Sequence, residues 1–500
     1  MKKLIALTFT AACASAPHPT PAPATKPASA QAPAPTTPDA EFRALPPQPG
    51  APVDFHAPIP KQLALSNGLK VFLIERRDVP LVTILLAVRS GADTEPGGKA
   101  GLASFALDLL AEGTPARDAA AIARAFEDLG ARYGTHADAD SSGAYVTALS
   151  STLEPVLDIF SDVVLRPAFR DADVERLRVE RLGAISQAMD DPASVGRNVL
   201  ARVVYGEHHP WGFPAEGTVK SIKSLARKDL VAWHKARFQP ADSALFVVGD
   251  TDEATLLPLL EARFGAWKNG AAAKPAANKA PKGNHRVVYV VDKPDAPQSQ
   301  IWVGEIGIAS TAPDIFPVRV MNNILGGTFN SRLNGNLRTE HAYSYGVFSF
   351  FDTHREGGSF TASAGVVSDK TAEALAEFVK ELEKMKGGEV TEAELSDAKE
   401  GLFRSIPALF ASDEQTAGAY ARAWAHGLPL DYYATYQQRV LAVTRDDVAR
   451  AARERLHPGN MAVVVVGPRK LIEEKVAAMK IGRIELRDAE GEALKAAASR

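Results

Sequence analysis

Two stretches of the sequence match each other without a gap over thirty residues, which constrains the fold more than any other feature. Residues 221–250 and 439–468 both run from a helical pattern through Arg-Phe/Leu-x-Pro into an apolar strand that ends in Val-Val-Gly. Residues 151–180 and 368–401 repeat a helix–turn–helix pattern at nearly the same offset. Self-similarity at a fixed offset indicates that one structural unit has been duplicated.

Each half also begins with strand patterns, which set the fold class. In the first half, the turn signal Ser66-Asn67-Gly68 separates two short strand patterns, as in a hairpin. The predicted strands are 63–65, 70–74 and 81–88 in the first half, and 286–291 and 300–306 in the second. We therefore predict an α+β fold of tandem duplicated α/β halves, with mostly antiparallel sheets and helices on one face, forming a clamshell around a cavity.

Two residues at equivalent places in the halves are predicted to begin charged amphipathic helices. Asp171 follows Phe169-Arg170 in the first half, and Thr391 follows Val390 in the second. Aspartate and threonine are both favoured at N-cap positions, because their side-chain oxygens accept hydrogen bonds from the first turn of the helix.

Composition divides the chain into segments. The Pro/Ala-rich stretches lack the large apolar residues that a core needs, so we expect them to be extended tethers and linkers. The predicted organisation is a signal peptide with a lipobox at 1–16, a tether at 17–52, an N-terminal half at 53–268, a linker at 269–284, a C-terminal half at 285–482 and a C-terminal tail at 483–500. The formal net charge of −3 is spread without long blocks of like charge, so no nucleic-acid partner is expected.

The N-terminus reads as an export signal. Lys2 and Lys3 precede an apolar run, 4–12, that is too short to span a bilayer. The run ends in Thr-Ala-Ala-Cys13, which resembles a bacterial lipobox in which the cysteine is lipidated; ordinary cleavage near residues 14–16 is the alternative. We expect a periplasmic or cell-envelope protein that touches a membrane only through a lipid on Cys13.

Since Cys13 is the only cysteine, the mature fold has no internal disulfide and no thiolate metal site.

Several motifs occur in an order that resembles the insulinase/pitrilysin zinc peptidases, also called inverzincins. The resemblance covers about residues 55–480. It rests on GLKVFL, SGADTEP, GLASFALDLLAEGT, ERLRVERLGAISQAMDDP, YGEHHPWGFPAEGT and FQPADSALFVVGD. The family carries His-x-x-Glu-His on a helix in its first half and a further glutamate ligand on a later helix. Two histidines four residues apart share one helix face and bind one zinc, while the glutamate acts as the general base.

The resemblance places different residues at all four positions of that zinc site. Ser104 and Asp108 stand where the two histidines would be, and Leu107 stands where the catalytic glutamate would be. Ala184 stands at the third ligand. Leu102, Phe105, Ala106 and Leu109 keep the apolar pattern of the helix. We therefore expect a degenerate site without zinc and no metal cofactor in this chain.

The remaining histidines offer no obvious replacement for the missing ligands. No two of the eleven are spaced i, i+4. His208 and His209 are adjacent, and we interpret them as a solvated loop pair. His136, near Asp138 and Asp140, could bind a stray cation, but a polar loop is the preferred interpretation.

The second half retains a segment that resembles the substrate-gripping part of the family. Residues 326–351 contain Ser-Arg-Leu, then Leu-Arg338, then Tyr345 seven residues after that arginine. By resemblance, Arg338 would hold a backbone carbonyl of a peptide, and Tyr345 would donate its hydroxyl to the developing oxyanion. A gap in the match would move the second role to Tyr343. The usual Gly-Leu before the tyrosine is replaced here by Ala342-Tyr343-Ser344.

An Arg/Tyr pair without a zinc motif resembles one subunit of the heterodimeric members of the family. The resemblance implies a non-catalytic, substrate-binding subunit of a bacterial envelope peptidase, inactive alone, with peptide as substrate and zinc in a homologous partner. The first alternative is a peptide-binding or assembly protein that has lost proteolysis. The second alternative is a metallohydrolase with relocated ligands.

Overall fold

The computed structural model describes residues 55–270 and 286–494. The predicted signal peptide, Cys13 and the tether lie outside these residues, as does most of the predicted linker. In the part of the chain that is described, no helix combines the length and apolarity needed to cross a membrane.

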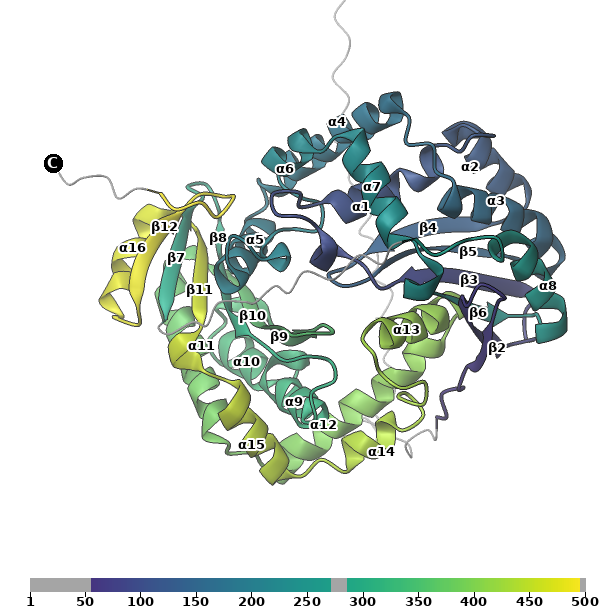
Figure 1. Cartoon of the computed structure of the whole chain (residues 1–500). Helices are drawn as coiled ribbons and strands as arrows, with labels where there is room; N and C mark the ends of the chain where they lie inside the picture. The colour runs from purple at the N-terminus through teal and green to yellow at the C-terminus, as the bar shows by residue number, and fades with distance from the viewer. Residues whose placement is uncertain (1–54, 271–285, 495–500) are drawn as a thin grey trace, which may run out of the picture. The chain divides into compact units, whose positions relative to one another are not determined.

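Two six-stranded sheets organise the described residues (Figure 1). The first has the strand order β1-β2-β6-β3-β5-β4, and the second has the order β12-β7-β11-β8-β10-β9. The strands of the first sheet are β1 (Lys61–Ala64), β2 (Lys70–Glu75), β3 (Leu81–Val88), β4 (Arg132–Ala137), β5 (Ser142–Leu149) and β6 (Ser243–Gly249). Those of the second are β7 (Val287–Asp292), β8 (Gln298–Ile306), β9 (Ser344–Thr353), β10 (Gly358–Val367), β11 (Ala462–Gly467) and β12 (Arg483–Arg487).

The two sheets share one topology over five strands. β2 pairs with β6 in parallel, as β7 does with β11, and the following three pairings are antiparallel in both sheets. The predicted strand 81–88 is β3, with the same bounds. The tandem, mostly antiparallel α+β fold predicted from the sequence repeat is therefore confirmed.

The sixth strand differs between the halves and corrects one boundary. In the first sheet the outer strand is β1, antiparallel to β2, whereas in the second it is β12, parallel to β7. Residues 483–487 therefore belong to a sheet and not to a C-terminal tail. Ile484 and Leu486 alternate with charged residues and pack against the core, which is the pattern of a strand with one buried face.

Helices cover both sheets. The first half contains α1 (Leu102–Asp108), α2 (Ala119–Asp128), α3 (Leu153–Leu165), α4 (Asp171–Ala188), α5 (Pro192–Tyr205), α6 (Val219–Ser224), α7 (Arg227–Arg237) and α8 (Glu253–Phe264). The second contains α9 (Ile315–Asn322), α10 (Arg332–Asn334), α11 (Thr371–Gly387), α12 (Glu392–Ser405), α13 (Asp413–Ala425), α14 (Tyr436–Leu441), α15 (Arg445–Arg455) and α16 (Arg469–Ala478).

One helix of each half packs against the sheet of the other half. Helix α5 packs on β8 and β11, and helix α13 packs on β3 and β6 (Figure 1). Val199 and Leu200 of α5 share a buried cluster with Val464 of β11. Tyr420 and Trp424 of α13 are buried with apolar side chains of the first sheet. The prediction of helices on one face is therefore incomplete, because the second face is covered by a helix from the opposite half.

Of the two predicted N-cap residues, one is confirmed and the other is not. Thr391 is the N-cap of α12: its hydroxyl accepts from the Glu394 N–H at 3.2 Å, and the Glu394 carboxylate accepts from the Thr391 N–H at 2.9 Å. Asp171 is instead the first residue of α4, and Arg170 occupies the cap position without a side-chain hydrogen bond. The prediction for Asp171 was wrong by one residue. An aspartate in the first helical turn still interacts favourably with the helix dipole.

The exchanged helices provide a matched test of their packing. A Cβ atom on Gly196 of α5 would lie 2.3 Å from Cδ1 of Trp302, whereas a Cβ on Gly418 of α13 meets nothing within 4 Å. Gly196→Ala should therefore destabilise the protein by about 1–3 kcal/mol through overpacking. Gly418→Ala should stabilise it by about 0.5–1 kcal/mol through higher helix propensity. Thermal and urea unfolding of both variants would measure this; equal effects would contradict the proposed packing of α5.

Candidate functional site

Helix α1 keeps the packing of a buried helix but not the chemistry of a metal site. Leu102, Phe105, Ala106 and Leu109 are all buried, as predicted. Leu107 is also buried, with 1% of its surface exposed. The helix thus presents only its polar positions to the rest of the site.

The N-terminus of α1 is held by a buried carboxylate. Glu95 accepts hydrogen bonds from the backbone N–H groups of Gly101, at 3.1 Å, and Ala103, at 2.8 Å. Burial raises the pKa of Glu95 to about 8, against the opposing effect of these two donors. Gly101 has φ 86°, and a Cβ there would lie 2.7 Å from the Glu216 carbonyl oxygen. Glycine is therefore required at the start of this helix.

An arginine from α4 lies across the polar face of α1. Arg181 donates from Nη1 to Ser104 Oγ at 2.7 Å and to the Glu216 carbonyl oxygen at 3.1 Å. Its Nη2 forms an ion pair with Asp108. The guanidinium also lies 5.1 Å from the centre of the Phe105 ring. One cationic group thus bridges the two positions at which the zinc motif would have histidines.

The residues at this place do not fit a zinc ion. The guanidinium of Arg181 already uses the side-chain oxygens of Ser104 and Asp108, and its positive charge opposes a metal cation. Ala184, three residues further along α4, has no donor atom, and Leu107 cannot accept a proton. The side chains at α1 therefore do not support a metal-dependent step.

The segment between α10 and β9 brings Arg338 and Tyr345 together. The Arg338 guanidinium carbon lies 3.9 Å from the centre of the Phe329 ring and 5.9 Å from that of Tyr345. Tyr345 is 86% exposed. Among the described residues, no hydrogen-bond partner is found for its hydroxyl. An arginine held against aromatic rings beside an exposed phenol is a preorganised donor pair.

Tyr343 lies in a different environment. Its ring is half-buried and stacks on His341, with the ring centres 5.0 Å apart. Ala342 has φ 53°, a left-handed conformation that favours glycine. In the match that gives the substrate role to Tyr345, the glycine of the family's Gly-Leu pair falls at Ala342. The left-handed backbone there suits a glycine, so it supports this match. The choice between the two tyrosines stays a prediction.

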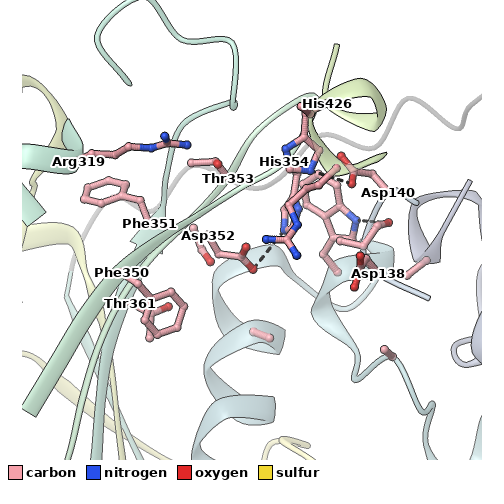
Figure 2. Close-up of a pocket in the computed structure, with 18 of the residues that line it drawn as sticks. Asp138, Asp140, Arg319, Phe350, Phe351, Asp352, Thr353, His354, Thr361 and His426 are labelled. Carbon is pink, nitrogen blue, oxygen red and sulfur yellow. Dashed lines mark hydrogen bonds and ion pairs between the residues drawn. The ribbon is translucent and has the colours of Figure 1, made fainter. Parts of the chain in front are cut away.

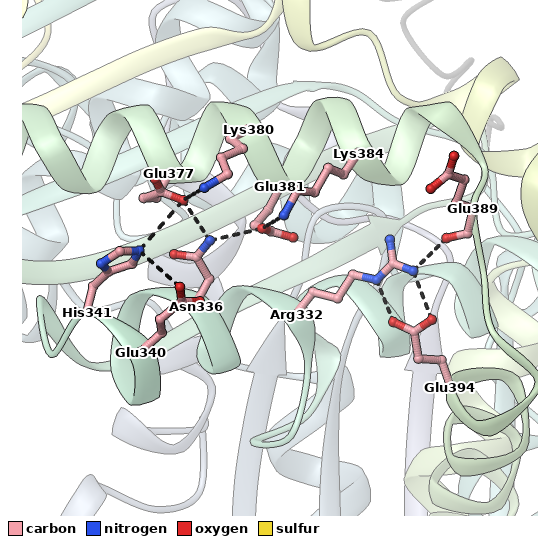
Figure 3. Close-up of polar contacts among 10 residues, drawn as sticks. All are labelled: Arg332, Asn336, Glu340, His341, Glu377, Lys380, Glu381, Lys384, Glu389 and Glu394. Carbon is pink, nitrogen blue, oxygen red and sulfur yellow. Dashed lines mark hydrogen bonds and ion pairs between the residues drawn. The ribbon is translucent and has the colours of Figure 1, made fainter.

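Polar contacts fasten the segment that carries Arg338 to helices α11 and α12 (Figure 3). Arg332 donates to both carboxylate oxygens of Glu394, at 2.6 and 2.9 Å, and this partner lowers the pKa of Glu394 to about 2. The Asn336 amide donates to Glu377 at 2.7 Å and to Glu381 at 2.9 Å. These contacts fix the backbone from which the Arg338 side chain extends.

A cavity of about 740 Å³ lies between the two halves. Its lining includes Asp140 from the β4–β5 loop, His354 from the β9–β10 turn and His426 after α13 (Figure 2). Among the described residues that line it, neither the Ser104/Asp108 pair nor the Arg338/Tyr345 pair is present. The Ser104/Asp108 pair and the Arg338/Tyr345 pair thus form two separate clusters outside this cavity.

Two histidines lie in environments that differ from those predicted from the sequence. His209 is not solvated: it is 7% exposed, stacks on Tyr205 and accepts a hydrogen bond at Nδ1 from the Trp211 N–H at 3.1 Å. His208 is exposed, as predicted. His136 lies in strand β4 and not in a polar loop. Asp140, in the loop that follows, lies 3.5 Å from His426.

Sequence reasoning missed Arg181 and the Asp140/His354/His426 cluster. A signal for Arg181 was present, since it stands three residues before Ala184 and therefore on the same face of a helix. No sequence motif within one segment indicates the Asp140/His354/His426 cluster. Its members come from three segments that lie far apart in the sequence: the β4–β5 loop, the β9–β10 turn and the end of α13.

A local negative potential surrounds His354. Burial lowers its pKa, but the contact with Asp352 and the charges of Asp352, Asp140 and Asp138 outweigh burial, so the pKa is raised. The cluster therefore favours a positive charge at this point of the cavity.

Comparison with protein families gives two matches along the chain. Residues 70–209 match the model described as insulinase (peptidase family M16), and residues 224–402 match the model described as the peptidase M16 inactive domain. Together the two models span most of the described residues.

Individual proteins agree with this result. An uncharacterized zinc protease of Mycobacterium leprae is 27% identical over 68% of this chain and 77% of its own length. The crystal structure of a peptidase M16 inactive domain from Pseudomonas fluorescens superposes with a TM-score of 0.76 at 26% identity, covering 82% of this chain and 98% of that one. The structure of a protease from Helicobacter pylori, at 23% identity and covering 82% and 100%, has a TM-score of 0.75 and supports the fold.

Arg181 can be tested by restoring the ligands around it. The variant S104H/D108H/A184E supplies two histidines and a glutamate while Leu107 is left in place. With Arg181 retained, we expect no zinc beyond that bound by the unmodified chain, because the guanidinium holds the site. Adding Arg181→Ala should allow about one further zinc per chain, measured by elemental analysis after dialysis.

The matched control for this test is Arg178→Ala in the same three-residue variant. Arg178 lies on the same helix, 5.7 Å from the Phe105 ring, but pairs with Glu175. Equal zinc uptake in the Arg178 and Arg181 backgrounds would show that Arg181 is not what excludes the metal.

Proposed function

Because this chain belongs to the insulinase family, peptidase family M16, and its zinc helix is bridged by an arginine, we propose that it is a non-catalytic, substrate-binding subunit. It would act with a homologous zinc-bearing partner as a bacterial envelope peptidase. The observation that carries the proposal is the Arg181 guanidinium between Ser104 and Asp108. A peptidase of this family needs a zinc-bound water and a base, and this chain offers neither at α1.

The substrate role is assigned to the Arg338/Tyr345 pair. A guanidinium offers a fixed fork of donors for a peptide carbonyl, and a neutral phenol can donate to an oxyanion. The exposure of Tyr345 supports this role, since a donor to a substrate in a shared chamber must be reachable from outside its own subunit.

Strand β9 supports recognition of extended peptides. It lies at the end of the second sheet, so one of its edges has no neighbouring strand in the described residues. Tyr345, Phe348 and Phe350 of β9 are 86%, 49% and 44% exposed. An extended peptide could pair with the open edge through main-chain hydrogen bonds, which tolerate many sequences, while the aromatic rings contact its apolar side chains. An unfolded or short peptide is the substrate class that fits.

The location of the protein is part of the proposal. The apolar run after Lys3 and the lipobox at Cys13 favour export to the periplasm or cell envelope. Both features precede the residues that the structure describes.

The substrate role predicts a specific kinetic effect. In the complex with a zinc-bearing homologue, Tyr345→Phe should lower kcat about 10²–10³-fold with little change in KM, because one oxyanion donor is lost. The measurement is the steady-state hydrolysis of a fluorogenic peptide.

Tyr343→Phe is the matched control, since it removes a hydroxyl only two residues away. It should leave kcat within about twofold of the unmodified complex. If Tyr343→Phe lowers kcat and Tyr345→Phe does not, the role belongs to Tyr343; if neither variant changes kcat, the oxyanion role is wrong for both.

A further inference from the structure

Three side chains from distant segments meet in the cavity between the halves. One potential ligand atom from each of Asp140, His354 and His426 lies within 4.8 Å of the other two. Figure 2 shows the three side chains together, with Asp352 beside His354. Within residues 55–270 and 286–494, no other group of three or more His, Cys, Asp or Glu residues has its potential ligand atoms this close together.

The carboxylate of Asp140 is buried and fixed in orientation. Asp140 is 1% exposed, and its Oδ2 accepts a hydrogen bond from the Arg355 N–H at 2.7 Å. Its Oδ1 is buried and accepts no hydrogen bond among the described residues. His426 Nε2 lies 3.5 Å from this oxygen, beyond a well-formed hydrogen bond. A buried carboxylate oxygen without a well-formed hydrogen bond is costly, so a metal ion bound at Oδ1 would stabilise it.

His354 is positioned by two neighbours. Its Nε2 lies 3.3 Å from Asp352 Oδ2, and the centre of its ring lies 4.5 Å from that of Trp211. Trp211 is fixed in turn, because its indole N–H donates to the Ala139 carbonyl oxygen at 3.1 Å. A carboxylate that contacts a histidine ring is the usual outer partner of a metal-binding imidazole.

The spacing suits a metal better than a hydrogen-bond network. Metal–nitrogen and metal–oxygen bonds of about 2.0–2.2 Å in a tetrahedral site place neighbouring ligand atoms about 3.3–3.6 Å apart. The His426 Nε2 to Asp140 Oδ1 distance of 3.5 Å falls in this range. The other two separations between ligand atoms are no greater than 4.8 Å, and rotation of an imidazole ring can shorten them to this range.

We propose that Asp140, His354 and His426 bind one divalent transition-metal ion between the two halves. Two imidazoles and one carboxylate suit zinc and its first-row neighbours, whereas magnesium and calcium prefer oxygen ligands alone. All three ligands line the cavity, so a further coordination position faces open space. The ion joins the β4–β5 loop of one half to the β9–β10 turn and the end of α13 of the other. The site is distinct from α1, and it does not depend on the function proposed above.

Metal titration of the purified, tag-free chain tests the site. After treatment with a chelator, the chain should bind one Co²⁺ with visible absorption bands of a nitrogen/oxygen site, and Zn²⁺ should displace the Co²⁺. Zinc should also raise the unfolding temperature, whereas Mg²⁺ and Ca²⁺ should not. Calorimetry gives the affinity and the stoichiometry.

Conservative variants separate ligands from neighbours. Asp140→Asn and His426→Gln should each weaken zinc binding at least about 100-fold, while Asp352→Asn should weaken it about 10–100-fold, as is typical of outer partners. The matched control is His457→Gln, since His457 forms a histidine–carboxylate pair with Glu305 at 3.0 Å without a third ligand. This variant should bind zinc like the unmodified chain.

Two results would overturn the proposal. One is the absence of stoichiometric cobalt or zinc binding by the folded chain, which would make the cluster a set of ion pairs. The other is binding that survives in Asp140→Asn and His426→Gln. The unfolding temperature of each metal-free variant verifies that it is folded. Neither result bears on the Arg338/Tyr345 role, which is measured by peptide hydrolysis.

Discussion

Helices α5 and α13 are exchanged between the halves, and each covers a face of the opposite sheet. Both sheets are apolar on two faces, and each half supplies its own helices for only one of them. Separating the halves would expose the second face of each sheet to water. At this junction Arg89 donates to the Trp424 carbonyl oxygen at 2.7 Å, and its guanidinium lies 4.1 Å from the Trp424 ring. The exchange therefore fixes the loops that enclose the cavity.

Two places in the molecule bear on metal binding, helix α1 and the cavity between the halves. At α1 a guanidinium stands in contact with the positions that a zinc peptidase gives to its metal ligands, so the helix is retained as structure. In the cavity, whose lining also includes Arg197, Arg319 and Arg422, the potential ligand atoms of Asp140, His354 and His426 lie within 4.8 Å of one another. The proposed metal site would supply the metal for the alternative function, a metallohydrolase with relocated ligands. No residue of the cluster is assigned a step in peptide hydrolysis.

The sequence predicted the regular core well, because long apolar runs leave few choices. The run 81–88 became β3 with unchanged bounds, and the repeat at 221–250 and 439–468 predicted equivalent strands in the two sheets. It missed β12, because charged residues alternate with only two apolar ones. His209 was misread because neither Tyr205 nor Trp211, which bury it, marks a core by pattern.

Among the candidate site residues, the sequence predicts only those that occupy positions of a recognisable motif. Ser104, Asp108, Arg338 and Tyr345 were found by their spacing in a resembled motif. Arg181 is not a position of that motif, so the motif alone does not predict its contact with Ser104 and Asp108. The Asp140, His354 and His426 cluster arises from tertiary contacts alone, so no pattern within a segment could reveal it.

The most direct measurement of the central claim is peptide hydrolysis by reconstituted subunits. This chain, a zinc-bearing homologue from the same organism, and their mixture are assayed at equal concentrations with the same peptide. A substrate-binding subunit without zinc should show no zinc-dependent hydrolysis alone. The mixture should be at least about 100-fold more active than the homologue alone, since it gains an oxyanion donor. A mixture no more active than the zinc-bearing homologue by itself would contradict the account.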